Sequence, residues 1–367
     1  MTPSTTTLRI LDAAANRAGE GLRVVEEYVR FGLNDAHLSQ LLKECRHELT
    51  AALAVIPEAG RLAARDTLGD VGTNIATVAE YQRDSLLDVV RASFKRVQEA
   101  LRTLEEYGKL LEQPAGMPPF APRIEQLRYR IYTVEKSTLK TAASAARLQD
   151  RNLYLLVTSA SCTQGLETTV RSAMAAGVQI VQLREKQMAD RDLLQLARDL
   201  RDWTAAADVL LIINDRPDIT VLADADGVHV GQDELTVRDA RQIVGPDRLI
   251  GVSTHSIQQA RQAVLDGADY LGVGPTFPSG TKSFDHFAGL DFVRQVASEI
   301  TLPWFAIGGI DATNVDSVLQ AGGCRVAVSG TICGAADPHQ ATTELVERLS
   351  RQPDCGYHVP RPESALD

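Results

Sequence analysis

The sequence predicts an α/β protein in which a (β/α)8 TIM barrel follows an all-α N-terminal domain. Residues 8–113 place apolar side chains at three- and four-residue steps, as amphipathic helices do, whereas short β-branched runs alternate with helical segments from residue 152 onward. Closely spaced prolines between Pro114 and Pro122 exclude a continuous helix between the two patterns. We therefore predict an all-α domain at 1–120, a linker helix at 121–150, a barrel at 151–350 and a disordered tail at 351–367.

Composition limits the classes of function. The chain has 367 residues and 44% hydrophobic side chains, enough to bury the cores of two domains. Its net charge of −10, without a Lys/Arg-rich block, argues against a nucleic-acid partner. No run approaches the roughly 20 apolar residues of a membrane span, and the N-terminus lacks the apolar core of a signal peptide. The sequence therefore predicts a cytoplasmic protein with no membrane partner.

The helical part contains a weak internal repeat, in which the pattern at 17–28 returns at 96–107. Two such helices can pair pseudo-symmetrically. The matching Arg and Glu residues are most simply explained as intrahelical ion pairs on solvated faces. Between the repeats, a loop rich in Gly, Asp and Thr offers Arg65, Asp66 and Asn74 as candidates for a second site. The domain has no Walker-type phosphate loop and no GxGxxG, so the sequence gives no specific support to nucleotide-dependent chemistry.

Eight short apolar runs predict the strands of the barrel. They are Leu153–Thr158, Gln179–Arg184, Val209–Asp215, Gly227–Val230, Leu249–Thr254, Tyr270–Thr276, Trp304–Gly309 and Arg325–Gly330. Helical periodicity between them is found at Thr169–Ala176, Leu193–Ala206, Ile257–Leu265 and Leu290–Val296. Such alternation is typical of a parallel sheet covered by helices. A count of eight units favours a closed barrel over the alternative, a doubly wound open sheet.

In such barrels the chemistry lies on the loops that follow the strands. The sixth run ends in a Gly-, Ser- and Thr-rich loop at 277–283, which can offer hydroxyl and backbone N–H groups to a phosphate. Arg184 ends the second run, Lys186 follows it, and Lys282 follows the sixth run; these side chains add cations at the same rim. These residues predict a site for a phosphorylated or pyrophosphorylated substrate in an otherwise acidic protein.

Carboxylates and glycines complete the predicted rim. Asp215 ends the third run, and Asp233 or Glu234 follows the fourth. Two such carboxylates suit Mg²⁺, which commonly takes one or two protein carboxylates and leaves its other positions to water and substrate phosphate. Gly308 and the backbone at 328–330 can approach a second phosphate closely. Two anion sites and one metal predict two phosphorylated small-molecule substrates.

The motifs QLREK, NDR, DGVHVGQDE, GVSTH, GVGPTFPSGTK, AIGGI and VAVSG together resemble thiamine-phosphate synthase over about residues 150–345. The resemblance implies a transferase of thiamine biosynthesis. It would join 4-amino-2-methyl-5-hydroxymethylpyrimidine diphosphate to 4-methyl-5-hydroxyethylthiazole phosphate, releasing pyrophosphate and forming thiamine phosphate.

The resemblance also assigns residues to roles. The residues implied to hold the pyrimidine diphosphate are Gln182, Leu183, Arg184, Glu185, Lys186, Asn214, Ser253 and Lys282. The residues implied to hold the thiazole phosphate are Ser279, Gly280, Thr281, Gly308, Val328 and Ser329. The catalytic residues implied are Arg184, Lys186, Ser253 and Lys282. Mg²⁺ would be bound by Asp215 and Glu234; the family usually has Asp at the second position, and the neighbouring Asp233 leaves open which carboxylate ligates.

The implied mechanism is a dissociative substitution. Loss of pyrophosphate leaves a pyrimidine methylene cation, which the thiazole nitrogen captures, so no protein nucleophile is required. His229 and His255 could act as general bases, but histidines at strand ends are more often hydrogen-bonded scaffolding, and we expect that role for both. The alternatives are a thiazole tautomerase, which would not need QLREK or the carboxylate pair, and a non-catalytic binder of thiamine intermediates.

The helical domain resembles one that is fused ahead of this synthase in some bacteria. Two roles stay open for it, a pyrimidine-phosphate kinase and a dimerisation module. A homo-oligomer is compatible with either.

Overall fold

The computed structural model describes residues 3–74, 82–112, 116, 118–278 and 288–351. All of the predicted tail at 351–367 except Arg351, and the loop residues Ser279, Gly280, Thr281 and Lys282, therefore lie outside the described residues. The chain divides into two compact units between Leu139 and Lys140. Each unit is described by itself below.

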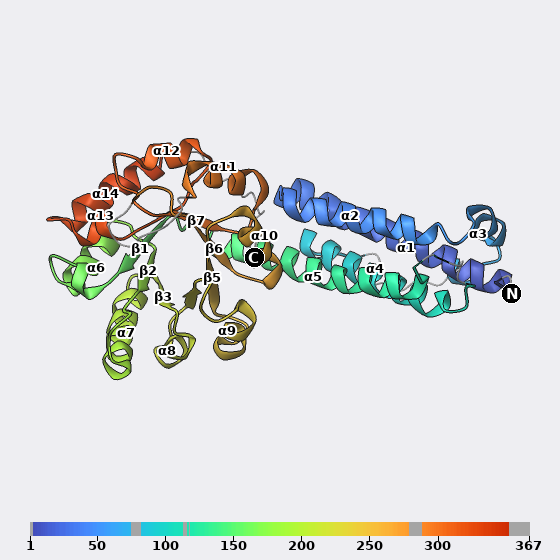
Figure 1. The fold of residues 1–367 in the computed structure, drawn as a ribbon, viewed down its shortest axis with the longest axis horizontal. Helices are drawn as coiled ribbons and strands as arrows, with labels where there is room; N and C mark the ends of the chain where they lie inside the picture. Colours follow the sequence, from blue (N-terminus) through green and yellow to red (C-terminus); the bar gives the residue numbers. More distant parts are fainter. Residues whose placement is uncertain (1–2, 75–81, 113–115, 117, 279–287, 352–367) are drawn as a thin grey trace. The chain divides into compact units, whose positions relative to one another are not determined.

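The first unit is entirely helical, as predicted (Figure 1). Its elements are α1 (Thr5–Tyr28), the π-helical turn η1 (Val29–Leu33), α2 (Ala36–Leu53), α3 (Glu58–Ala64), the 3-10 turn η2 (Val71–Asn74), α4 (Leu86–Gly108) and α5 (Phe120–Arg147), which contains the division point. Side-chain caps begin the long helices: Ser4 accepts a hydrogen bond from the Thr7 N–H, and Asp35 accepts one from the Leu38 N–H.

The two copies of the repeat form α1 and α4, which pack side by side. Gly21 allows the close approach, because a Cβ added there would lie 2.7 Å from Val97 Cγ2. Leu22 and Leu101, at equivalent positions of the repeat, are both fully buried. The repeat is therefore a packing motif that pairs one helix with its own copy.

The predicted intrahelical ion pairs are present in both copies. Arg23 Nε lies 3.1 Å from Glu27 Oε1, and Arg102 Nη2 lies 2.7 Å from Glu106 Oε1. All four side chains are more than 40% exposed, so these pairs lie on solvated faces and add little stability.

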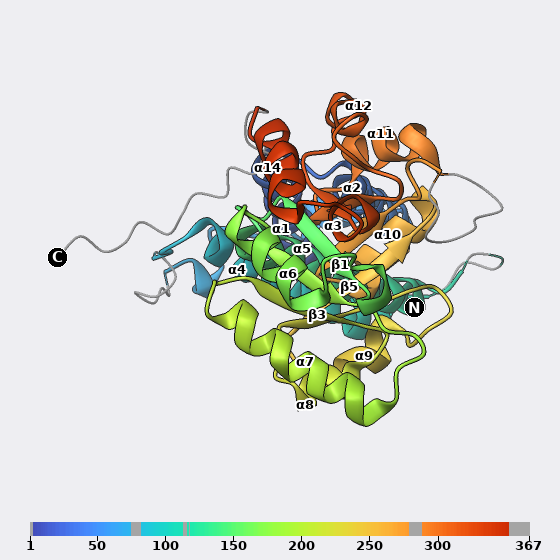
Figure 2. The ribbon, with the colours of Figure 1, turned by 90° about the vertical axis from the view of Figure 1, so that its left-hand side faces the viewer.

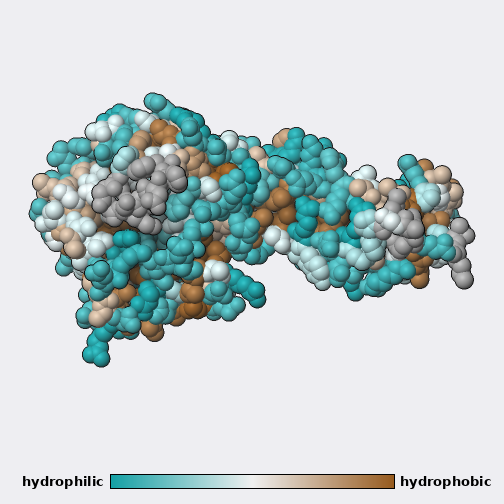
Figure 3. Space-filling model, in the orientation of Figure 1, coloured by the Kyte–Doolittle hydropathy of each residue, from teal (hydrophilic) through white to brown (hydrophobic). Residues whose placement is uncertain are grey.

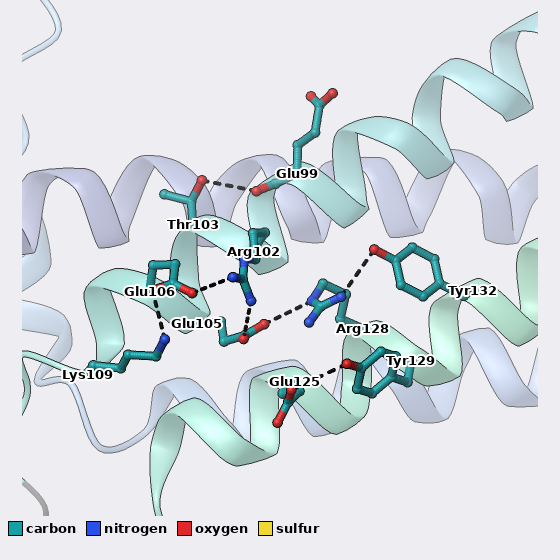
Figure 4. Close-up of polar contacts among 10 residues, drawn as sticks. All are labelled: Glu99, Arg102, Thr103, Glu105, Glu106, Lys109, Glu125, Arg128, Tyr129 and Tyr132. Atoms are coloured by element: carbon teal, nitrogen blue, oxygen red, sulfur yellow. Dashed lines mark hydrogen bonds and ion pairs between the residues drawn. The ribbon is translucent and has the colours of Figure 1, made fainter.

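The prediction that these charges all lie on solvated faces is wrong for the other glutamate of each copy. Glu26 and Glu105 are buried, and each binds an arginine from the next long helix of the chain. Arg46 Nε donates to Glu26 at 3.1 Å, and Arg128 Nε donates to Glu105 at 2.9 Å (Figure 4). The sequence spacing could not show this, since the partner lies about 20 residues away.

The candidate loop of this unit is largely committed to internal contacts. Arg65 donates to both carboxylate oxygens of the buried Asp12, at 2.7 and 3.0 Å. Asp66 accepts a hydrogen bond from the Gly69 N–H, and its carbonyl accepts one from Arg9. These contacts give the loop a structural role.

The second unit is the predicted closed barrel, with eight parallel strands hydrogen-bonded in chain order (Figure 2). Its strands are β1 (Leu153–Val157), β2 (Ile180–Leu183), β3 (Leu210–Asn214), β4 (Gly227–Val230), β5 (Leu249–Thr254), β6 (Tyr270–Val273), β7 (Trp304–Ile307) and β8 (Val326–Val328). Every predicted run contains one strand, and several runs extend past it into the following loop.

Helices cover the outside of the barrel. They are α6 (Leu166–Ala175), α7 (Asp190–Ala205), α8 (Pro217–Leu222), α9 (Val237–Val244), α10 (Ile257–Asp266), α11 (Gly289–Glu299), α12 (Val315–Gln320), α13 (Gly330–Cys333) and α14 (Pro338–Leu349), with the short 3-10 turn η4 (Ser159–Ser161) after β1. The surface visible in Figure 3 is mostly hydrophilic, with apolar side chains between helices. Among the described residues no helix is long and apolar enough to span a bilayer.

Aromatic side chains fill the lower part of the barrel. The rings of Tyr154 and Tyr270 meet the ring of Phe305 edge-on, with centroids 5.2 and 5.8 Å apart. All three are at most 1% exposed. These three rings form a packed floor that leaves the upper part of the barrel open.

The two tryptophans also belong to this unit. Trp304 on β7 is buried, and Trp203 on α7 lies beneath the Arg171 guanidinium.

Candidate active site

A pocket of about 530 Å³ opens at the carboxyl ends of the strands. Ten of the predicted site residues line it: Gln182, Arg184, Lys186, Asn214, Asp215, Glu234, Ser253, Gly308, Val328 and Ser329. Parallel strands of a barrel bring their carboxyl ends to one rim, which is why residues far apart in sequence meet here. The two histidines His229 and His255 and the acidic Asp233 also reach the pocket.

Two predicted residues of the QLREK segment point elsewhere. Leu183 is 1% exposed and belongs to the core. Glu185 Oε1 accepts a hydrogen bond from the Ser159 N–H at 2.6 Å, which ties β2 to the loop after β1. Successive side chains of a strand face opposite sides. The pocket therefore receives Gln182, Arg184 and Lys186, and the two residues between them do not line it.

Charged groups gather on one side of the pocket. Lys186 Nζ lies 3.4 Å from Asp215 Oδ2 and 3.8 Å from Glu234 Oε1. Asn214 Nδ2 donates to Asp215 Oδ2 at 2.7 Å. The Asp215 backbone has φ of 61°, a left-handed conformation that costs energy in a non-glycine residue and is found at functional sites. The fold thus holds this carboxylate in one place.

The two carboxylates fit a divalent cation. They converge on one ammonium group, so the site already favours positive charge. A Cβ at Gly231 would lie 2.3 Å from Glu234 Oε2, which shows that this side chain folds back over the glycine. No group of three or more potential metal ligands occurs among the described residues. Mg²⁺ shared with a diphosphate needs only one or two carboxylates.

A chain of hydrogen bonds beneath the pocket was not predicted from the sequence. Gln182 Nε2 donates to Tyr154 Oη at 2.6 Å, and the Tyr154 and Tyr270 hydroxyls are 2.9 Å apart. Tyr270 Oη lies 3.2 Å from His229 Nδ1, and His229 Nε2 lies 2.9 Å from Ser253 Oγ. The chain fixes the side chains of Gln182 and Ser253. The available signals were two tyrosines and His229, which are polar side chains in otherwise aliphatic strands.

The chain depends on a glycine. A Cβ at Gly251 would lie 2.2 Å from Tyr270 Cζ and 2.4 Å from His229 Nδ1. Only glycine leaves room for the two rings to meet. The remaining acceptor of the network, Gln182 Oε1, is buried and has no hydrogen-bond partner within the described part of the chain. Because an unsatisfied buried acceptor is costly, it is suited to receive a donor from a ligand.

Burial lowers the pKa of His229 to about 4. The imidazole is therefore neutral near pH 7. One of its nitrogens donates a hydrogen bond and the other accepts one, with Ser253 and Tyr270 as the two partners. His255 is also hydrogen-bonded, with Nδ1 2.6 Å from the Gly274 carbonyl oxygen. Both contacts agree with the expected scaffolding role.

Acidification is expected to destabilise the barrel through His229. The unfolded imidazole takes up a proton below its ordinary pKa of 6.5, whereas the buried one stays neutral until the pH reaches about 4. The free energy of unfolding is therefore at its full value above pH 6.5. It falls by about 3 kcal/mol in total as the pH decreases from 6.5 to about 4. Urea unfolding of the wild type and His229→Asn at pH 7 and about pH 4 measures the effect. Equal pH dependence in both proteins would show that the imidazole does not contribute.

The chain matches two family models. "Thiamine monophosphate synthase" matches residues 153–332, and "ThiD2 family" matches residues 9–137. A thiamine-phosphate synthase of Rhodopirellula baltica is 46% identical over 359 residues, which cover 95% of this chain and 94% of the relative. The chain belongs to the thiamine-phosphate synthase family.

Other members agree with this assignment. A thiamine-phosphate synthase of Synechocystis is 42% identical over 343 residues, 94% of this chain and 96% of the relative. The solved structure of thiamine phosphate pyrophosphorylase from Pyrococcus furiosus matches with a TM-score of 0.51 and 31% identity, over 55% of this chain and 97% of that one. As a member of this family, the chain is a transferase of thiamine biosynthesis that forms thiamine phosphate.

Proposed function

We propose that the pocket at the barrel mouth is where the pyrimidine diphosphate and the thiazole phosphate are joined, with Mg²⁺ as cofactor. The observation that carries this proposal is the convergence of Arg184, Lys186, Asp215 and Glu234 on one pocket. A diphosphate needs cationic groups, and a shared metal needs carboxylates beside them. The volume of about 530 Å³ suits two small substrates held together.

The pyrimidine ring lies against the hydrogen-bonded floor in this proposal. Gln182 Oε1, buried and without a partner in the described residues, accepts a hydrogen bond from the ring amino group. Asn214 and Ser253 line the same part of the pocket. The His229 contact holds the Ser253 hydroxyl in place for the substrate. The ring is thereby oriented with its diphosphate toward the rim.

The cations hold the diphosphate. Arg184 is half-buried at the end of β2 and has no side-chain partner in the described part of the chain, so its guanidinium is free for phosphate oxygens. Lys186 stands beside the carboxylates, and Lys282 would join from the loop outside the described residues. Asp215 and Glu234 would hold Mg²⁺, which when bound adds positive charge to neutralise the departing pyrophosphate.

The reaction breaks one C–O bond and forms one C–N bond. The electron pair of the methylene C–O bond leaves with pyrophosphate, and the ring amino group stabilises the resulting cation. The thiazole nitrogen then donates its lone pair to the methylene carbon. Gly308, Val328 and Ser329, with Ser279, Gly280 and Thr281 outside the described residues, would hold the thiazole phosphate. The protein stabilises a leaving group and aligns two reactants.

Incubation of the protein with both substrates, with and without Mg²⁺, tests the proposal. Thiamine phosphate is expected to form only with the metal, and the Asp215→Ala variant should not form it. Product formed equally well without Mg²⁺ would remove the metal from the proposal. If both substrates bind but no product forms, the two rivals are separated by adding the unaromatised thiazole tautomer: its conversion indicates a tautomerase, and none indicates a binder.

The second metal ligand is expected to be Glu234. Its carboxylate lies 3.8 Å from Lys186 Nζ, next to Asp215, whereas no such contact involves Asp233 among the described residues. Glu234→Gln should raise the Mg²⁺ concentration for half-maximal activity by about tenfold, since one charged ligand is lost. Asp233→Asn is the matched control and should change it less than twofold. The opposite order would assign Asp233.

The helical unit has two candidate roles, a pyrimidine-phosphate kinase and a dimerisation module. Its match to the ThiD2 family fits the kinase role. We also propose that the barrel domain spans 151–350 and that the protein is cytoplasmic, as the sequence predicts. Sedimentation of the full chain would test the dimerisation alternative.

A further inference from the structure

The internal repeat places two similar ion clusters in the helical unit, and the copy on α4 and α5 is closed. Glu105 lies between Arg102 and Arg128, as Figure 4 shows. The Arg128 guanidinium carbon is 4.8 Å from the Tyr129 ring centre and 5.6 Å from that of Tyr132. The Arg128 side chain is only 9% exposed, and its guanidinium is occupied by Glu105 and the two tyrosine rings.

The cation that follows the repeat in the closed copy is also neutralised. Lys109 follows the repeat by two residues, and its Nζ lies 2.8 Å from Glu106 Oε2 (Figure 4). Arg30 is its counterpart after the first repeat, but no ion pair involves Arg30 in the described part of the chain. Its guanidinium instead lies 4.8 Å from the ring centre of the exposed Phe31. The two copies therefore differ in whether this charge is satisfied.

The copy on α1 and α2 is open. A groove of about 670 Å³ lies beside its buried glutamate, lined by Arg23, Glu26, Arg30, Ser39, Gln40, Lys43, Glu44, Arg46 and His47. Among the described residues no tyrosine lines it, unlike the closed copy, and Arg46 remains 32% exposed. The π-helical turn η1 contributes Arg30 to its wall, and such turns occur frequently at functional sites.

The groove carries an excess of positive charge. Its lining has four Arg or Lys side chains and two glutamates. Arg23 and Arg46 are directed at Glu26, at 3.7 and 3.1 Å. Glu44 accepts from Gln40 and pairs with Arg130, which lies outside the lining.

Two cations remain available. Arg30 and Lys43 face the groove and have no ionic partner among the described residues. Unpaired cations that share one groove can attract an anion together.

We propose that this α1–α2 groove is an anion site that binds the phosphate group of a small phosphorylated molecule. Arg30 and Lys43 supply the unpaired charge for its oxygens, and Arg46 supplies a partly exposed guanidinium at the floor. The site lies entirely within the helical unit. It is independent of the barrel pocket and of the reaction proposed there.

Calorimetric titration of the full chain with inorganic phosphate, at low ionic strength and about pH 8, tests this site. The barrel is proposed to bind phosphate at two places, so the titration uses the Arg184→Ala/Lys186→Ala background, in which the diphosphate site is weakened. The thiazole-phosphate site is common to all variants compared, and the α1–α2 groove is the component of the isotherm that Arg30→Ala/Lys43→Ala is expected to weaken by at least about tenfold, since two charge-assisted hydrogen bonds are lost. With the barrel intact, the same pair should leave thiamine phosphate formation unchanged.

Arg91→Ala/Lys109→Ala is the matched control. Both side chains are more than 50% exposed on α4, and their removal changes the net charge equally. This pair should change phosphate affinity less than twofold. If the two double variants weaken phosphate binding equally, the effect is one of overall charge, and the proposed site is overturned. No phosphate binding in the barrel-weakened background would overturn it as well.

Discussion

Replacing Arg184 with alanine is expected to lower kcat/KM for thiamine phosphate formation by about 10³-fold, mainly through kcat. The negative charge on the pyrophosphate grows as its bond to the methylene carbon breaks. A guanidinium that is half-buried and unpaired in the described structure stabilises that growing charge more than it stabilises the bound substrate. Steady-state kinetics with both substrates measures the change, and Arg184→Lys should recover part of it, because the charge is kept but the bidentate geometry is lost.

Arg294→Ala is the control for this variant. Arg294 lies on α11, pairs with Asp291 and does not line the pocket. Its replacement should leave kcat/KM within about twofold, as expected for an exposed ion pair. A rise in KM at constant kcat for Arg184→Ala would assign the arginine to substrate binding only. Unchanged kinetics would remove it from the diphosphate site.

Replacing Glu105 with alanine is expected to destabilise the helical unit by about 3 kcal/mol or more. The loss leaves Arg128 with a side chain that is 9% exposed and no carboxylate to balance its charge. The Tyr132 hydroxyl, which accepts from Arg128 Nη1 at 3.2 Å, compensates only in part. Urea unfolding followed by helical circular dichroism measures the shift.

Glu106 provides the matched control one residue away. Its side chain is 42% exposed and pairs with Arg102 and Lys109 on the same helix. Glu106→Ala should cost no more than about 0.5 kcal/mol. The double variant Glu105→Leu/Arg128→Leu removes both buried charges and should recover much of the loss. If Glu105→Ala and Glu106→Ala behave alike, the buried pair does not contribute as argued.

Much of the fold could be predicted from periodicity. The eight strands of the barrel lie within the predicted runs, because each is a short apolar segment bounded by polar loops. Ten predicted residues meet at one rim, because chain order in a parallel barrel brings strand ends together. Both results depend only on the local residue pattern and on the fold class, and a single sequence is enough to predict these.

Contacts between distant segments could not be predicted in this way. The Tyr154–Tyr270 contact depends on the registers of eight strands around the barrel, and the Tyr270–His229 contact depends on the small Gly251 beside both rings. The burial of Glu26 and Glu105 likewise depends on which helix packs over each copy of the repeat. A pattern within one helix shows that charges can pair, but not whether a neighbour removes them from water.

Both tryptophans of the chain, Trp203 and Trp304, belong to the barrel unit. Their emission is therefore an optical label for one half of the molecule, while the helical half has only tyrosine and phenylalanine as intrinsic chromophores. Fluorescence follows the barrel unit, whereas circular dichroism recorded on the same sample follows the helices of both units. Coincident denaturation midpoints would mean that the two units melt together, and separate midpoints that each melts alone.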